Sequence, residues 1–146
     1  MTIVREKRLL RQRMASLRSS LEPDEHAMKS RRICERIREW IFKDSAAGSG
    51  AHRFAVAAYM PHRAEVDVTP LIEFCWAHGI RVAVPRVADR SRAELAMHWI
   101  RGYDDLETGA YGIREPKAGT PETEDPGQFG LILVPGLAFD ETFARL

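Results

Sequence analysis

A chain of 146 residues that is 45% hydrophobic is long enough to bury one core, and we expect a single domain over 1–146. No apolar run approaches the roughly 20 residues that span a bilayer, and none follows the N-terminal arginines as in a secretory signal, so we expect a cytoplasmic protein without membrane partners. The net charge is +1, but lysines and arginines outnumber acidic residues over 1–38 and are outnumbered in the remainder. A basic N-terminal region favours an anionic partner, either nucleic acid or a small phosphate or carboxylate ligand, whereas a solvated helix face is the plainer reading of most of these arginines.

The first 43 residues are predicted to form a helical hairpin. Apolar residues recur at roughly helical spacing from Thr2 to about Ser19, with basic residues between them. Pro23 and the two acidic residues after it suit the first turn of a second helix, which runs to about Phe42. A stretch rich in Ser, Gly and Ala is then expected to form a flexible connector.

Residues 53–146 are predicted to form an α/β core. Four segments favour strands: 54–59, 80–85, 94–100 and 131–134. A helix that begins at Thr69 and ends near His78 separates the first two strands, and this order requires parallel pairing. The last strand is an uninterrupted apolar run, which predicts burial on both faces. We therefore expect a three-layer fold with a mostly parallel sheet flanked by helices, preceded by the hairpin.

The remaining patterns indicate neither a disulfide nor a metal site. Pro, Gly, Thr and acidic residues are dense over 117–130 and predict a surface loop. Cys34 and Cys75 both lie in helical patterns beside apolar neighbours, so we expect two small buried side chains. A metal site would need more ligands at tighter spacing. No metal ligand and no catalytic side chain is assigned.

Four short segments, in order, resemble the signature of the 5-formyltetrahydrofolate cyclo-ligases, also called methenyltetrahydrofolate synthetases. They are Lys7 to Arg11, Tyr59-Met60-Pro61 with Glu65-Val66-Asp67, Gly112-Ile113-Arg114-Glu115-Pro116, and Pro135-Gly136-Leu137-Ala138-Phe139-Asp140 followed by Arg145-Leu146. Each segment is weak alone, but their common order makes chance a poor explanation. The resemblance implies a fold like that of sugar-phosphate isomerases and CoA-transferases.

The chain departs from the family pattern near its C-terminus. In the family, Arg-Leu leads into a glycine-rich G-x-G-G-G-Y-Y-D segment that handles phosphate, metal and substrate, and that segment does not occur in this sequence. Family members also usually carry Gly where this chain has Phe143. We therefore expect a C-terminally incomplete cyclo-ligase domain, with little or no activity of its own and a tendency to associate through an uncovered apolar face.

Three basic residues of the first predicted helix form the candidate nucleotide site. Lys7 and Arg11 are four residues apart, so they share one helix face and can converge on one anion. Arg8 lies 100° further round and can equally face solvent. By resemblance, Lys7 and Arg11 contact the phosphates of ATP, and we place Arg8 in the same cluster.

A second group of residues forms the candidate substrate site. Glu65 follows the first strand at its carboxyl end, where open α/β sheets place ligands. Tyr59 and Met60 beside it can form an apolar wall. By resemblance Glu65 and Met60 bind the folate and Tyr111 packs on it, although Tyr111 could equally be an ordinary loop aromatic. Asp67 is expected to cap the following helix rather than to bind a ligand.

The implied reaction is the ATP-dependent conversion of 5-formyltetrahydrofolate to 5,10-methenyltetrahydrofolate, with release of ADP and phosphate, in one-carbon folate metabolism. The resemblance implies ATP and Mg²⁺ as cofactors and no nucleic acid as a partner, and it leaves the oligomeric state open. Three alternatives are a catalytically inactive relative that binds folate or a nucleotide, a nucleic-acid-binding module that uses the basic helices, and a sugar-phosphate isomerase or CoA-transferase.

Overall fold

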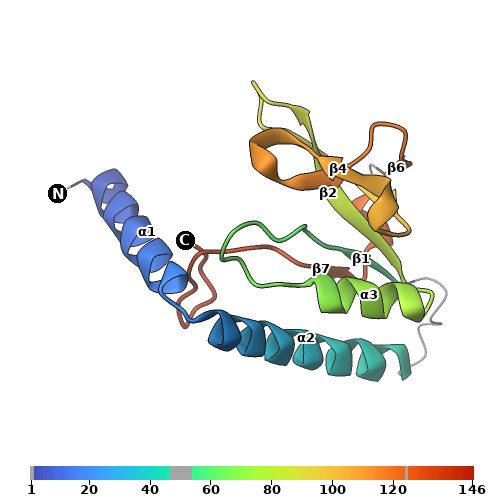
Figure 1. Cartoon of the computed structure of the whole chain (residues 1–146), viewed down its shortest axis with the longest axis horizontal. Coiled ribbons are helices and arrows are strands. Elements are labelled where there is room, and N and C mark those ends of the chain that lie inside the picture. Colours follow the sequence, from blue (N-terminus) through green and yellow to red (C-terminus); the bar gives the residue numbers. More distant parts are fainter. Residues whose placement is uncertain (1, 47–53, 124) are drawn as a thin grey trace.

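The computed structural model describes residues 2–46, 54–123 and 125–146 and shows an α/β fold (Figure 1). Its α-helices are α1 (Ile3–Ser19), α2 (Pro23–Ala46) and α3 (Thr69–Ala77). Its strands are β1 (Ala55–Ala57), β2 (Arg81–Asp89), β3 (Glu94–Ile100), β4 (Leu106–Thr108), β5 (Arg114–Pro116), β6 (Glu122–Thr123) and β7 (Leu131–Ile132). Most of the predicted connector lies outside the described residues. None of the described helices is both long and apolar enough to cross a membrane.

The main sheet is mixed, with strand order β6-β3-β2-β1-β7. β1 pairs in parallel with β2 and with β7, as the strand–helix–strand order predicts. β3 pairs antiparallel with β2 and with β6, so the half of the sheet away from β7 is antiparallel. β4 and β5 form a separate hairpin. The predicted α/β class is confirmed, and the parallel pairings occupy the half of the sheet that carries the candidate site.

The core lies between the main sheet and α3. Val56 of β1 is in register with Val82 of β2 and Leu131 of β7, so the three side chains share one face of the sheet. Leu71 and Ile72 of α3 are fully buried in the same cluster. The predicted first strand is confirmed as buried, because all three residues of β1 are inaccessible to solvent.

The prediction that the last strand is buried on both faces is wrong for the described part of the chain. Leu131 and Leu133 pack against the core, but Ile132 is 55% exposed and Val134 is 54% exposed. Apolar composition alone predicts burial, whereas position in the sheet decides it, and β7 is the edge strand here. No helix among the described residues covers this second face, so the third layer stays a prediction.

The two N-terminal helices are present, but they diverge instead of packing along their lengths (Figure 1). α2 runs beside α3 and buries Ser30, Cys34 and Ile41 on one face. α1 buries no residue and extends away from the sheet. The two predicted helices are therefore confirmed as elements, while the predicted hairpin opens out between Ser19 and Pro23.

The described part of the predicted surface loop over 117–130 contains a strand that its composition does not reveal, β6, and a short 3-10 helix at Pro126–Gln128. Within it, β6 pairs with β3, and Thr123 lies opposite Met97. A two-residue strand is too short to produce a recognisable alternation of polar and apolar residues. The segment nevertheless remains largely exposed, as predicted.

Candidate functional site

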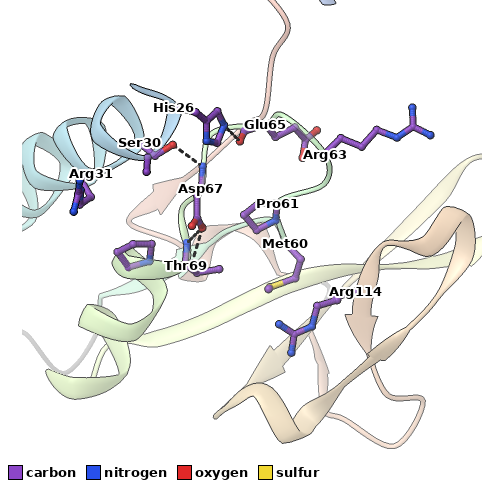
Figure 2. Close-up of a pocket in the computed structure, with 12 residues that line it drawn as sticks. His26, Ser30, Arg31, Met60, Pro61, Arg63, Glu65, Asp67, Thr69 and Arg114 are labelled. Carbon is purple, nitrogen blue, oxygen red and sulfur yellow. Dashed lines mark hydrogen bonds between the residues drawn. The ribbon is translucent and has the colours of Figure 1, made fainter. Parts of the chain in front are cut away.

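A pocket of about 490 Å³ opens where the loop after β1 faces α2, the start of α3 and β5 (Figure 2). Met60 and Glu65 come from the loop, His26 and Ser30 from α2, Thr69 from α3 and Arg114 from β5. The volume lies within the range of roughly 300–1,000 Å³ that is usual for small-molecule sites. The pocket lies beyond the carboxyl end of β1, where open α/β sheets place their ligands.

Three side chains on one face of α2 hold this loop in place. His26, Ser30 and Cys34 are spaced four residues apart, so they follow one another along the helix. The Nε2 atom of His26 lies 2.9 Å from the carbonyl oxygen of Glu65 and must therefore donate to it. The hydroxyl of Ser30 accepts from the amide of Asp67 over 3.0 Å, and the thiol of Cys34 donates to its carbonyl over 3.4 Å.

Only one oxygen of the Glu65 carboxylate accepts a hydrogen bond from the described part of the chain. Its Oε2 atom accepts a hydrogen bond from the backbone amide of His62 over 2.9 Å, which closes the turn between the two residues. The amide of Glu65 donates to the carbonyl of His62 over 3.2 Å. Its Oε1 atom has no hydrogen-bond partner among residues 2–46, 54–123 and 125–146 and remains able to accept from a ligand.

Asp67 lies just before α3, but the prediction that it caps the helix is wrong, because the N-cap residue is Val68 and no side chain makes a capping bond there. The Oδ1 atom of Asp67 accepts from both the amide and the hydroxyl of Thr69, over 3.0 and 2.6 Å. Those two bonds direct the carboxylate toward the first turn of the helix, where a negative charge is favourable. Asp67 therefore has a structural role, although it also borders the pocket.

Tyr59 and Met60 have different roles in this loop: Tyr59 supports it, whereas Met60 borders the pocket. The hydroxyl of Tyr59 donates to the carbonyl of Val66 over 3.0 Å, so it supports the loop from behind. Burial, helped by the nearby charge of Glu65, raises the pKa of Tyr59 to about 12. Met60 is almost fully buried but borders the pocket, to which it offers an apolar wall.

The other predicted site residues lie outside this pocket. Lys7, Arg8 and Arg11 are exposed on α1, and none of them borders it. Tyr111 is 76% exposed on a turn of its own, where its ring faces the guanidinium of Arg90 at 5.7 Å. The structure thus brings Met60 and Glu65 together with Tyr59 behind them, and it does not bring Tyr111 or the basic residues of α1 to the same place.

Among the residues that border the pocket, the sequence analysis missed four with a basic or titratable side chain: His26, Arg31, Arg63 and Arg114. The regular spacing of His26, Ser30 and Cys34 is a usable signal for the first, since it marks one polar stripe on a predicted helix. Arg114 lies inside the family-like segment that begins at Gly112, but only the pairing of β5 with β4 shows that the segment returns toward Met60.

No metal centre is visible in the described ranges, since no three His, Cys, Asp or Glu side chains converge there. Cys34 and Cys75 are both buried and free, as predicted. Asp140 is a turn residue: its Oδ1 atom accepts from the amide and hydroxyl of Thr142 and from the amide of Ala144. These hydrogen bonds hold the pKa of Asp140 below its ordinary value.

The fold is that of the methenyltetrahydrofolate synthetases. The solution structure of the 5,10-methenyltetrahydrofolate synthetase from Aquifex aeolicus matches with a TM-score of 0.72 and 26% identity, over 92% of this chain and 62% of that one. The structure of the synthetase from Mycoplasma pneumoniae matches with a TM-score of 0.68 and 20% identity, over 96% of this chain and 70% of that one.

The chain belongs to the 5-formyltetrahydrofolate cyclo-ligase family, whose sequence profile matches residues 3–146. It is 30% identical to the 5-formyltetrahydrofolate cyclo-ligase of Escherichia coli K12 over 91 aligned residues, and this alignment covers 62% of this chain and 50% of that protein. It is 30% identical over 114 residues to the enzyme of the same name from Mycolicibacterium smegmatis, over 77% of this chain and 56% of that protein. The chain thus spans about half the length of the curated relatives it matches, and the predicted family is confirmed.

Proposed function

We propose that this chain takes part in the cytoplasmic, ATP-dependent conversion of 5-formyltetrahydrofolate to 5,10-methenyltetrahydrofolate, and that its pocket holds the pterin end of the folate. Membership of the cyclo-ligase family supports the reaction. One observation supports this placement of the substrate. In a pocket of suitable size, the Glu65 carboxylate has an oxygen that is free to accept a hydrogen bond, and the side chain of Met60 beside it forms an apolar wall.

The chemistry of a pterin fits these two side chains. A pterin is a flat ring whose edge carries amide-type and amino donors, and a carboxylate is a strong acceptor for such donors. Its ring faces are apolar enough to lie against the thioether of Met60. The bonds from α2 to the loop keep Glu65 in position before the ligand arrives, which lowers the ordering cost of binding.

In the proposed reaction the formyl oxygen attacks the terminal phosphorus of ATP and ADP leaves, because that oxygen is a poor leaving group until it is esterified. The anilino nitrogen of the same folate then attacks the formyl carbon and loses its proton to solvent, and the carbon–oxygen bond breaks as phosphate leaves. Such a transfer depends on positioning and on screening of negative charge. We assign the screening to Lys7, Arg8 and Arg11 on the basis of their charge and their spacing on α1. None of the three borders the pocket that contains Glu65.

Mg²⁺ is part of the proposed family reaction, and the described residues give no ligand set to which it can be assigned. They contain no group of three side chains that could hold a metal ion. We therefore derive no step through a metal and assign no residue to one.

The test of the proposed function is calorimetric titration of the 146-residue chain with 5-formyltetrahydrofolate. We expect saturable binding that falls about tenfold in Glu65→Gln, which removes the charge from the acceptor and keeps its shape. Glu39→Gln is the matched control, because Glu39 lies exposed on α2 and does not border the pocket. Absence of binding by the parent chain, or equal losses in the two variants, would contradict the proposal.

A further inference from the structure

Arg114 is an oriented cation at the edge of the pocket. Its guanidinium lies over the ring of Tyr103, 5.0 Å from the centroid. The hydroxyl of Tyr103 donates to Glu73 over 2.7 Å, and its ring packs edge-on to Trp76 at 5.2 Å. Because two partners hold Tyr103, it is a rigid platform, and an arginine stacked on such a face keeps the donors along its edge free for a planar anion.

The charges around the pocket are not balanced by the protein. Three arginines border it, Arg31, Arg63 and Arg114, and none forms an ion pair with any part of the chain that the structure describes. Of the two carboxylates there, that of Asp67 is committed to Thr69. The pocket therefore favours a ligand that brings carboxylate or phosphate oxygens of its own.

We propose that Arg114 forms a carboxylate subsite that binds the glutamate tail of the folate. This rests on the proposed function, in which Glu65 and Met60 bind the pterin. Figure 2 shows Met60 between the loop that carries Glu65 and the strand that carries Arg114. A folate whose ring lies against Met60 can thus place its donors at Glu65 and its anionic end toward Arg114.

The glutamate tail is favoured over a nucleotide phosphate as the source of these oxygens. A folate combines in one molecule the two groups that this pocket can bind: a ring edge rich in hydrogen-bond donors and a tail with carboxylates. The candidate phosphate-binding residues Lys7 and Arg11 lie on α1 and do not border this pocket. The guanidinium of Arg114 can also donate two parallel hydrogen bonds to the two oxygens of one carboxylate.

The experiment measures three ligands by calorimetry: 5-formyltetrahydrofolate, the corresponding 5-formyltetrahydropteroate that lacks glutamate, and a non-hydrolysable ATP analogue. In Arg114→Gln we expect affinity for the glutamate-bearing ligand to fall about tenfold and affinity for the pteroate to stay within twofold. Arg81→Gln is the matched control, because Arg81 lies over the ring of Trp99 at 4.3 Å, outside this pocket. It should change neither affinity.

Arg114→Lys keeps the charge without the paired donors and should lose part of the selectivity for glutamate, and circular dichroism reports whether each variant is folded. Equal losses for both folates in Arg114→Gln, or a loss confined to the ATP analogue, would overturn the subsite while leaving the proposed function intact. If the parent chain binds neither folate, the proposed function fails and this inference fails with it.

Discussion

The hydroxyl of Ser30 accepts a hydrogen bond from the backbone amide of Asp67 over 3.0 Å, and this contact joins α2 to the loop that carries Glu65. Ser30 is buried, and its neighbours along the same helix face, His26 and Cys34, bond to the same loop. A loop that follows a buried strand contains backbone groups that need partners away from water. Here α2 supplies them, so the position of a candidate ligand group depends on a helix that is remote in sequence.

Replacement of Ser30 by Ala should therefore lower both stability and ligand affinity. The change leaves the amide of Asp67 without its partner at a partly buried position, at a cost of about 1–2 kcal/mol in the free energy of unfolding. Urea denaturation followed by circular dichroism measures it. Ser16→Ala on the exposed α1 is the control, for which we expect a change below about 0.5 kcal/mol. If Ser30→Ala matched the control, the bond would contribute nothing to the loop.

Glycine at position 109 is required by the side chain of Glu115. A Cβ atom at Gly109 would lie 2.0 Å from Cδ of Glu115, a distance at which one of the two groups has to move. Glu115 is held, because its Oε2 atom accepts from the amide of Val87 over 3.3 Å and its Oε1 atom lies 3.5 Å from the guanidinium of Arg86. The hairpin that carries Arg114 is fastened to β2 through these contacts.

Gly109→Ala should consequently destabilise the protein by about 1–3 kcal/mol, the usual cost of overpacking. Gly119→Ala is the matched control, since a Cβ atom there meets nothing within 4 Å. Thermal unfolding compares the two variants. Because the hairpin positions Arg114, we also expect Gly109→Ala to weaken binding of 5-formyltetrahydrofolate, whereas Gly119→Ala should leave it unchanged. A Gly109→Ala protein as stable as the control would show that Glu115 moves aside freely.

The helices and the buried strands could be predicted because their signals are local. The Pro23 start of α2 depends on the fixed backbone angle of proline and on acidic residues that follow it directly. The parallel pairing of β1 with β2 follows from the helix between them. The position of Glu65 and Met60 beside a pocket was predictable for a similar reason, since any loop at the carboxyl end of a parallel strand adjoins the edge of the sheet where ligands bind.

What could not be predicted depends on neighbours that are distant in sequence. The exposure of Ile132 follows from the edge position of β7, which apolar composition does not reveal. The divergence of α1 from α2 is invisible to periodicity, which identifies an apolar face but not what covers it. Arg114 reaches the pocket only through the pairing of β4 with β5, and its platform Tyr103 is held by α3.

Stability should fall at alkaline pH because of the buried thiol of Cys75. Burial raises the pKa of this thiol to about 12, from an ordinary value of 9.0. Between these values the unfolded chain has lost the proton while the folded chain keeps it, so unfolding is favoured progressively as pH rises. Below about pH 9 both states are protonated, and Cys75 adds no pH dependence.

The free energy of unfolding, measured by urea denaturation under reducing conditions from pH 8 to pH 11, should therefore decline above pH 9. The contribution of Cys75 approaches about 1.4 kcal/mol per pH unit at most. Cys75→Ala lacks the titrating group and should show a shallower decline, whatever its absolute stability. If the free energy of unfolding of this variant fell with pH as steeply as that of the parent chain, other groups would cause the alkaline sensitivity. Tyr59 is one candidate, because its pKa is also raised to about 12.

Phe143 occupies a backbone conformation that suits glycine. Its φ angle is 64°, in the left-handed region, and its side chain is 88% exposed and so gains little from packing. The turn around it is built by Asp140, whose carbonyl accepts from the amide of Phe143 over 3.0 Å and whose carboxylate accepts from the amide of Ala144 over 2.9 Å. This geometry gives a physical reason for the glycine that family resemblance leads us to expect at this position.

Phe143→Gly should accordingly stabilise the chain. Relief of the left-handed strain is worth about 1–2 kcal/mol, and the greater freedom of glycine in the unfolded chain offsets about 0.5–1 kcal/mol of it, so a net gain of about 0.5–1 kcal/mol is expected in urea denaturation. Ala144→Gly is the control, because Ala144 has an ordinary negative φ and should lose stability from the same substitution. Opposite signs for the two variants would locate the strain at Phe143, whereas losses of similar size in both would show that its conformation costs the fold nothing.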